Sequence, residues 1–412
     1  MSAAPGYAGR VQAYRVVSRA YFHLPVVVVF LVQQGFGAAA TALLLALYGL
    51  TAALGDHVVA PLRRRLSLAG CLVVGEAVKI AGLLVLLAPV SAASATVSQL
   101  LSGLGFCLTA GTDAALASSL TSGERHRRGE TRVQAGMFLI SFAAGALGAV
   151  AYSAQARVPF ALSVLGCAIA AAVVWPPGGA RALRSESVTA ARAPGGPKEP
   201  AVRRALPWEV RMWSAYYSVS RAVLLTAYTL LLPLVLFFGV RLSVAAFGAV
   251  LGLYTLCGLL SVRLAAVWQR RYAAVAAVSL FWLSSAAMAL GLLLAAFGGA
   301  VGTVCATAFL GLAGGTVRPT TMGFLGPAMT GLPAPERQRV TRGLERRQGI
   351  LQAALLSGSG LWLGLGHSPE GALAGCAALV LAGQAVAVRL ILRRPAPVPA
   401  PAATPAPSRQ AA

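Results

Sequence analysis

The chain has 412 residues, of which 58% are hydrophobic and only 11% are charged, whereas soluble domains carry about 25% charged residues. This composition, with a mean hydropathy of +0.75, excludes an ordinary soluble domain and predicts a polytopic helical membrane protein. The net charge of +23 would suit a nucleic-acid partner, but the basic residues gather at the ends of apolar runs, so we expect no nucleic acid.

Twelve apolar runs follow one another along the chain, each close to the ~20 residues that a helix needs to cross a bilayer. Turn or charge signals such as "SGERHRRGE" and "HSPEG" separate them. We therefore predict an all-α integral membrane protein with twelve transmembrane helices. The predicted spans are 20–36, 39–60, 67–89, 95–118, 134–155, 159–176, 211–238, 244–264, 273–297, 299–323, 346–366 and 371–392.

The basic residues predict the orientation of these spans. If the N-terminus lies inside, 30 of the 34 Lys and Arg residues fall on the inner side or at inner helix ends. Arg157 and Arg241 fall outside, and Lys79 and Arg221 fall within spans. Because cytoplasmic loops carry an excess of Lys and Arg, this pattern predicts a multi-pass protein of the plasma (cytoplasmic) membrane with both termini in the cytoplasm.

The spans divide into two groups of six. We predict a cytoplasmic N-terminus over 1–19, an N-terminal six-helix half over 20–176, and a C-terminal six-helix half over 211–392. A segment rich in Pro, Gly, Ala and Arg, 177–210, reads as a flexible cytoplasmic linker between them. The Pro/Ala-rich stretch 393–412 reads as a disordered cytoplasmic tail.

The two halves resemble each other at an offset of 206 residues. "LALYGLTAAL" and "LGLYTLCGLL" align so that Tyr48 meets Tyr254, and Arg64 and Arg65 meet Arg270 and Arg271. Gly105 meets Gly311 at the same offset. A parallel repeat of six helices is one of the arrangements that transporters use, so the halves are predicted to be pseudo-repeats.

The two six-helix halves, the basic turn after the second span and "GLGFCLTAGTDAAL" in the fourth resemble the major facilitator superfamily, over about residues 20–392. The inner-gate motif of that family matches at Gly55, Arg63, Arg64 and Arg65. The family's Asp position is Val59 here, and Asp56 lies three residues earlier, so the sequence leaves open whether an inner-gate ion pair forms. The resemblance implies transport by rocking of the halves.

Glu76 and Lys79 lie in the third span, three residues apart, so they share one face of a helix and can form an ion pair. A charge at a helix centre costs about 2.5–3.5 kcal/mol on insertion scales, and pairing reduces that cost. Two interpretations remain open at this stage. The pair either fixes the third helix against a neighbour or takes part in coupling or gating.

Asp113 lies on the fourth span, which the resemblance places on the cavity wall. A carboxylate that faces a cavity of low dielectric constant can exchange a proton near neutral pH, so Asp113 is a candidate proton carrier. Alternatively, Thr109 or Thr112 caps it, or a basic residue on another helix pairs with it.

Arg221 lies in the seventh span, which the resemblance also places on the cavity wall, and three tyrosines flank it. An arginine among aromatic side chains could bind an anionic or aromatic cargo or pair with Asp113, or it could extend to the inner interface instead. Further polar candidates lie at the outer end of the first span, where they line a cavity or face the interface. The cavity candidates beside Arg221 are Tyr216, Tyr217, Tyr228, Gln33 and Gln34.

These features predict a secondary active transporter, most simply one that couples proton entry to export of a small, partly apolar compound. Uptake or facilitated diffusion of a metabolite on the same fold is the alternative, and a membrane receptor or enzyme would need a catalytic cluster or soluble domain that the sequence does not show. No phosphate-binding loop is visible, so ATP is not expected to drive transport. We expect no cofactor, no metal site and a monomer in the lipid bilayer.

Overall fold

The computed structural model describes residues 5–120, 123–177, 179–183, 208–272, 276–329 and 334–392, and everything said below concerns these residues. They form helices joined by short turns. The first half of the chain contains α1 (Pro5–Val17), α2 (Val27–Gln33), α3 (Ala38–Leu54), α4 (Asp56–Arg65), α5 (Leu68–Val85), α6 (Ala92–Thr109), α7 (Thr112–Leu120), α8 (Gly123–Ala154), α9 (Val158–Val174) and the short turn η1 (Gly179–Leu183).

The second half of the chain repeats this pattern of long apolar helices. It contains α11 (Trp208–Thr226), η2 (Ala227–Leu231), η3 (Leu234–Gly239), α12 (Val244–Arg271), α13 (Ala276–Phe297), α14 (Gly299–Met329), α15 (Ala334–Gly364) and α16 (Pro369–Leu392). The two π-helical segments η2 and η3 flank Pro233. Proline has no N–H to donate to the preceding turn, which accounts for the wider helical turns around it.

Eight helices in the described part of the chain are long and apolar enough to cross a membrane, and the bent pair of α3 and α4 makes a ninth if it counts as one span. The prediction of a helical membrane protein is therefore confirmed, whereas the count of twelve spans is not. Helix α9 has only 17 residues, and α15 begins in a charged stretch. Eleven of the twelve predicted spans nevertheless coincide with one helix or with consecutive helical segments.

The predicted first span, 20–36, is the exception and was wrong as a single helix. Helix α1 ends at Val17, before the predicted start, and α2 begins only at Val27. Pro25 lies in the turn between them. Pro25 has no N–H to donate within a helix, which is consistent with a turn at this point of the apolar run. Helix α1, which we assigned to the N-terminal extension, instead packs against α7, α8 and α9.

The predicted linker 177–210 is ordered at both of its ends. In η1, the carbonyls of Ala182 and Leu183 accept hydrogen bonds from the hydroxyl and the backbone N–H of Ser67, at the start of α5. At the other end, α11 already begins at Trp208. The remainder of the linker, 184–207, and the tail, 393–412, lie outside the described residues.

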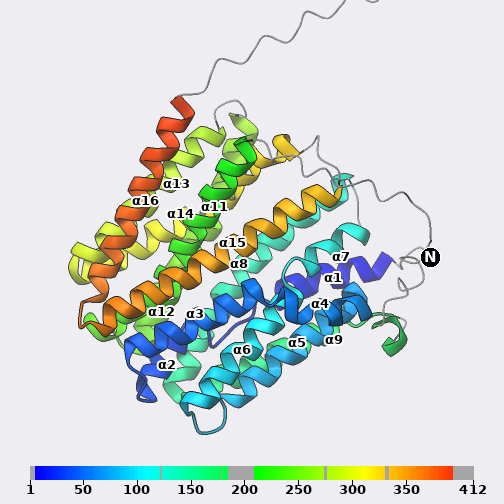
Figure 1. Ribbon diagram of the computed structural model, residues 1–412, viewed down its shortest axis with the longest axis horizontal. Helices are drawn as coiled ribbons and strands as arrows, with labels where there is room; N and C mark the ends of the chain where they lie inside the picture. Colours follow the sequence, from blue (N-terminus) through cyan, green and yellow to red (C-terminus); the bar gives the residue numbers. More distant parts are fainter. Residues whose placement is uncertain are drawn as a thin grey trace, which may run out of the picture.

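Two pairs of helices join the halves. Helices α3 and α15 run side by side through the middle of the molecule, with α1, α5, α6 and α9 on one side and α11, α13, α14 and α16 on the other (Figure 1). Helices α8 and α12 form the second pair. Small residues permit the close approach: a Cβ added at Gly360 would lie 3.0 Å from Cβ of Ala42, and one added at Gly349 would lie 2.8 Å from Cβ of Ala53.

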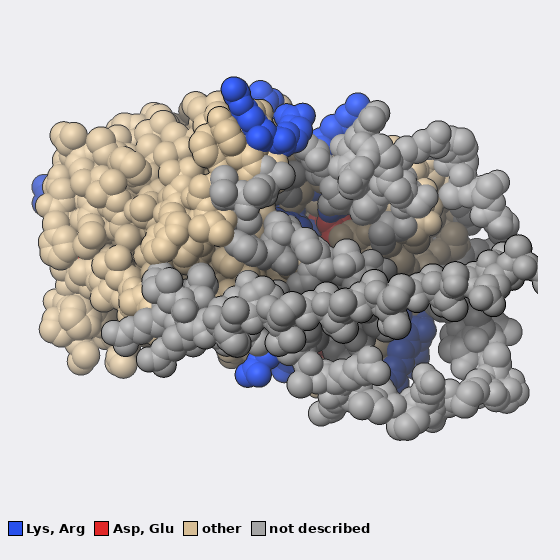
Figure 2. Space-filling view, turned by 90° about the horizontal axis from the view of Figure 1, so that it is seen from above, with Lys and Arg blue, Asp and Glu red and all other residues tan. Residues whose placement is uncertain are grey.

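The arginine clusters gather at one end of the helix bundle, which we call the basic end. Figure 2 shows blue atoms concentrated beside the grey segments, with a red patch in a recess among them, whereas the tan part on the left carries blue only at its edge. The clusters that define the basic end are Arg63, Arg64 and Arg65 on α4, Arg270 and Arg271 on α12, and Arg346 and Arg347 on α15.

The repeat predicted from the sequence has a structural counterpart. On α6, a Cβ added at Gly103 would lie 2.8 Å from the carbonyl oxygen of Tyr48 on α3. On α14, a Cβ added at Gly311 would meet the carbonyl oxygen of Tyr254 on α12 closer than 3.0 Å. The partner of Gly311 is therefore Gly103 and not Gly105, so the offset is 206 residues for α3 and α12 but 208 for α6 and α14.

Candidate functional site

Glu76 and Lys79 form a buried ion pair in α5. The Lys79 Nζ lies 2.7 Å from the Glu76 Oε1, and the Glu76 side chain is fully buried. Gly75 and Gly105 let α5 and α6 approach so closely that a Cβ at Gly105 would meet Cγ of Lys79 at 2.6 Å. The predicted face-sharing pair is thus present, and close helix packing keeps water away from it.

Two tyrosines complete the network around this pair. The Tyr14 hydroxyl, on α1, donates a hydrogen bond of 2.9 Å to the Glu76 Oε1. The Lys79 Nζ donates to the Tyr21 hydroxyl at 3.4 Å and lies 5.5 Å from the centre of that ring. The network therefore connects α5 to α1 and the turn after it, which sequence spacing alone did not reveal.

Asp113, at the start of α7, pairs with a basic residue of another helix. Its Oδ2 lies 3.3 Å from the Nε of Arg15 on α1, and both side chains are largely buried, at 13% and 6% exposure. Thr112 donates its hydroxyl to the carbonyl of Leu108 and so does not cap Asp113. Of the alternatives that the sequence left open, pairing with another helix describes the structure, and the partner is Arg15 rather than Arg221.

Arg221 and Tyr217, on α11, face the opposite helix α15. The Tyr217 hydroxyl donates a hydrogen bond of 3.1 Å to the Glu345 Oε1 on α15. Tyr217 also interacts electrostatically with Arg221, and so does Tyr254 of α12. The ring of Tyr228, in η2, packs against that of Tyr254 with ring centres 4.5 Å apart and the planes tilted by 33°.

Arg19, in the turn after α1, brings the first half into the same region. Its guanidinium lies 5.8 Å from the centre of the Phe106 ring on α6. Its electrostatic neighbours include Asp113 of its own half and Glu345 of the other half. We name Arg19, Arg221, Tyr217, Tyr254 and Glu345 the interhalf cluster, because its members come from both halves of the chain.

Three of the predicted cavity residues lie elsewhere. Tyr216 points into its own half, where its hydroxyl contacts the Ser284 Oγ at 2.5 Å and its ring packs on Phe281. Gln33 is exposed at the end opposite the basic end and accepts a hydrogen bond of 2.5 Å from Tyr152. Gln34, exposed beside it, ends α2. Their place in the sequence did not reveal which face each helix turns toward the other half.

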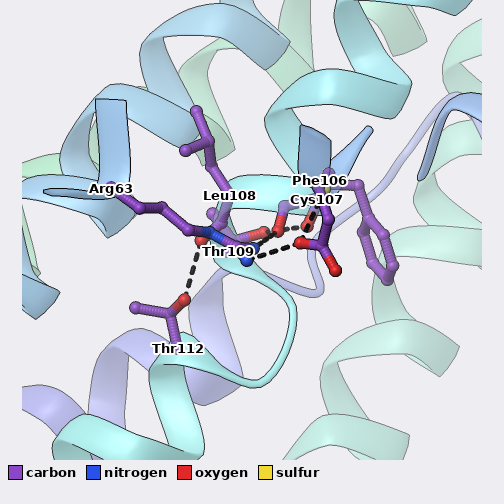
Figure 3. A network of polar contacts seen from close by, with 7 residues as sticks. Arg63, Phe106, Cys107, Leu108, Thr109 and Thr112 are labelled. Carbon is purple, nitrogen blue, oxygen red and sulfur yellow. Dashed lines mark hydrogen bonds and ion pairs between the residues drawn. The ribbon is translucent and has the colours of Figure 1, made fainter. Parts of the chain in front are cut away.

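The inner-gate motif forms an ion pair despite its altered spacing. The Arg63 Nη1 lies 2.5 Å from the Asp56 Oδ1. This ion pair joins the first residue of α4 to its last turn. Arg63 also donates to the carbonyl of Cys107, at the end of α6, as Figure 3 shows. Gly55 sits at the bend between α3 and α4, where an added Cβ would lie 3.2 Å from Leu104. Arg64 and Arg65 are exposed.

This motif stabilises the break between α6 and α7. The last carbonyls of α6 have no intrahelical donors, so they need other partners. The hydroxyl of Thr109 donates to the carbonyl of Phe106, and that of Thr112 to the carbonyl of Leu108 (Figure 3). Gly111, with φ of 74°, provides the left-handed residue in the short break between α6 and α7. The motif in this structure therefore acts within one half.

Several residues of the site were missed from the sequence. Arg15, Arg19 and Glu345 lie in stretches that we assigned to a terminus or a charged turn, although each contacts the region between the halves. The stretch that forms α1 is too polar to resemble a membrane span, and only Tyr14 and Tyr21 indicated a packed helix there. An apolar hollow of about 280 Å³ beside Leu43 and Thr96 contains none of the candidate residues.

No protein-family model matches the chain, and no curated protein matches it by sequence. Solved structures do match it. A mutant of the nucleoside transporter NupG superposes with a TM-score of 0.70 at 11% identity, over 93% of this chain and 99% of that chain. Unmutated NupG superposes with a TM-score of 0.68 at 11% identity, over 94% of this chain and 100% of that chain. A bacterial homologue of the iron transporter ferroportin, in an inward-facing state, superposes with a TM-score of 0.67 at 14% identity, over 93% of this chain and 98% of that chain.

The chain therefore has the fold of the major facilitator superfamily transporters, as the sequence predicted. At this level of identity the likeness establishes the fold alone, and a fold does not determine the solute.

Proposed function

We propose that this protein is a secondary active transporter that moves a small, partly apolar organic solute across the plasma membrane by alternating access. The observation that carries the proposal is the interhalf cluster, in which Arg19 of the first half interacts electrostatically with Glu345 of the second half. A solute bound there contacts both halves at once. Its binding energy can therefore favour one arrangement of the halves over the other, as coupling requires.

The contacts between the halves suit such a rearrangement. Helices α3 and α15, and α8 and α12, meet through small side chains, for example Gly49 against Ala353 and Gly248 against Ala149. Gly252 and Gly258 of α12 also accommodate the rings of Phe142 and Phe138 of α8. Small residues thus bring the two bundles into close contact, and we expect the bundles to tilt against each other there. Among the described residues, helix α4 makes its main contacts with elements of its own half, α3, α5 and α6.

The finer proposal is proton-coupled export by a monomer with both termini in the cytoplasm. Its support is the ion pair between Asp113 and Arg15, which joins α7 to α1 next to Arg19. Protonation of Asp113 would release Arg15 and change the charge that the interhalf cluster experiences. The two arrangements of the halves would then differ in proton affinity.

Transport in vesicles tests both levels of the proposal. Inside-out vesicles that contain the protein should accumulate at least one solute of a broad panel, and an imposed proton gradient should increase the accumulation. The variant Asp113→Asn should abolish the gradient-driven part and spare exchange of labelled for unlabelled solute. Asp56→Asn is the matched control, because it removes the same charge from an exposed pair.

Each outcome has a defined meaning. Accumulation against a gradient by Asp113→Asn would overturn the coupling role of Asp113, and transport only in right-side-out vesicles would indicate uptake. Failure of every solute to move, in either orientation of the vesicles, would contradict the transporter function itself.

A further inference from the structure

Among the described residues, neither Arg19 nor Arg221 of the interhalf cluster forms an ion pair with a carboxylate. The Nε atoms of Arg19 and Arg221 are buried and without a hydrogen-bond partner among the described residues. Arg15 and Arg63 each pair with an aspartate, although the Nε of Arg63 is likewise buried without a hydrogen-bond partner among the described residues. A buried N–H without an acceptor costs free energy, so a ligand that accepts from the Nε of Arg19 or Arg221 would be favoured.

The internal repeat allows Arg221 to be compared with the corresponding arginine of the first half. At the offset of 206 residues, Arg221 on α11 corresponds to Arg15 on α1. Arg15 pairs with Asp113, but the corresponding stretch of α14, 319–321, reads Pro-Thr-Thr and contains no carboxylate. The hydroxyls of Thr320 and Thr321 donate to carbonyls of α14 itself. The second half thus retains the cation of the pair without its anion.

The surroundings of Arg221 have a consistent chemical character. Glu345 is the carboxylate shared in this region, since Tyr217 donates to it and Arg19 interacts with it. Asp113, the other carboxylate near Arg19, already pairs with Arg15, and Arg318 adds a further positive charge near Tyr217, so the region carries a net positive charge. Tyr254 interacts electrostatically with Arg221, and its ring packs against that of Tyr228 with the two planes tilted by 33°, so the two rings offer an apolar surface.

We propose that the interhalf cluster binds a small organic anion, namely a carboxylate attached to an aromatic or similarly planar body. This inference rests on the proposed function, because it names the class of solute that the transporter takes. Arg221 binds the carboxylate, since a guanidinium presents paired N–H donors that match two carboxylate oxygens. Arg19 adds charge from the first half, and the ring pair of Tyr228 and Tyr254 packs on the planar body.

A carboxylate fits this cluster better than a neutral or cationic solute of the same shape. A neutral amide would leave the positive charge of Arg221 unbalanced, and a cation would add to it. Binding of the anion also gives Arg221 an ion-pair partner, and it adds to the counter-charge that Asp113 and Glu345 supply to Arg19. The specificity should therefore lie in the charge of the solute more than in its apolar body.

Equilibrium binding to the purified full-length protein in lipid nanodiscs tests the proposal. The probes are benzoate, phenylacetate and naphthoate, each compared with its primary amide, and the readouts are tryptophan fluorescence and ligand-induced thermal stabilisation. At least one acid should bind, and its amide should bind at least about tenfold more weakly, because hydrogen bonds between charged partners are the strong ones.

Variants of the protein locate the binding. Arg221→Gln should weaken binding of the acid about tenfold to a hundredfold, and Arg221→Lys should fall between it and the unmodified protein, since lysine keeps the charge but loses the paired donors. Arg157→Gln is the matched control: it removes the same charge from an exposed position at the end opposite the basic end and should leave binding unchanged.

Equal binding of acid and amide, or no binding of any acid, would overturn the proposal, as would full affinity in Arg221→Gln. If Arg221→Gln does not fold, the comparison of acids with amides on the unmodified protein still decides whether the protein selects for a carboxylate. Transport of a neutral or cationic solute in the vesicle assay, with no binding of acids, would leave the transporter function standing and refute only the solute class.

Discussion

At the scale of single residues, the ion pairs of this protein differ in how far they are buried. Glu76 and Lys79 are removed from water between α5 and α6, with Tyr14 as a third member, whereas Asp56 is half exposed and its partner Arg63 is about a quarter exposed. A buried charge that loses its partner is strongly destabilising, while an exposed pair contributes little. The two pairs should therefore respond very differently to the same change.

Glu76→Gln should lower the midpoint of thermal unfolding of the purified protein, because it leaves the Lys79 ammonium buried and unpaired at a cost of about 3–5 kcal/mol. The double variant Glu76→Gln with Lys79→Met should recover most of the loss. Asp56→Asn is the control and should cost less than about 1 kcal/mol. Harmless single changes at both Glu76 and Lys79 would show that the pair makes no contribution to stability.

The same residues show what the sequence could predict. The pairing of Glu76 with Lys79 followed from a spacing of three on one helix, which is a local rule. The partner of Asp113 is Arg15, 98 residues away, and no local rule connects them. Arg19 and Glu345 were missed for the same reason, since a site built between two halves depends on how distant helices pack.

At the scale of elements, the sequence predicted helices well and their breaks poorly. The apolar runs located α5, α8 and α12 to α14, because hydrophobicity follows directly from composition. The breaks at Pro25 and Gly111 depend on backbone geometry that an apolar run conceals. Close packing between elements depends on single glycines, of which Gly103 and Gly311 are the repeat-related pair.

Gly311→Ala tests this packing. The new methyl group would meet the carbonyl oxygen of Tyr254 on α12 closer than 3.0 Å, so α12 and α14 must separate, at about 1–3 kcal/mol. Gly375→Ala is the matched control, because α16 leaves open space there, and it should be neutral or stabilising by about 0.4–1 kcal/mol. Thermal unfolding of the two variants gives the comparison, and equal stability would contradict the close contact.

At the scale of the whole molecule, the two ends of the helix bundle differ in their charge and in the contacts between the halves. The arginine clusters lie at the basic end, and close contacts between α3 and α15 continue to the other end, where Gly364 meets Ala39. The ends of α3 and α15 must therefore separate at this contact before a solute can enter or leave the interhalf cluster from that side. The fold and its two-fold repeat followed from the sequence, but the contact between Gly364 and Ala39 did not, because it depends on how two distant helices pack.

A disulfide across this contact tests whether opening is required for transport. A Cβ added at Gly364 would lie 3.4 Å from Cβ of Ala39, near the ~3.5–4.5 Å range that disulfides span. Oxidation of the double variant Ala39→Cys with Gly364→Cys should lock the halves together at this end and stop transport in vesicles, and a reducing agent should restore transport.

The two single-cysteine variants, oxidised in the same way, control for the native cysteines, of which Cys305 is exposed. Thiol counting establishes that the bond has formed. A cross-linked protein that transports as fast as the single variants would show that this end does not open, and alternating access through the interhalf cluster would then be wrong.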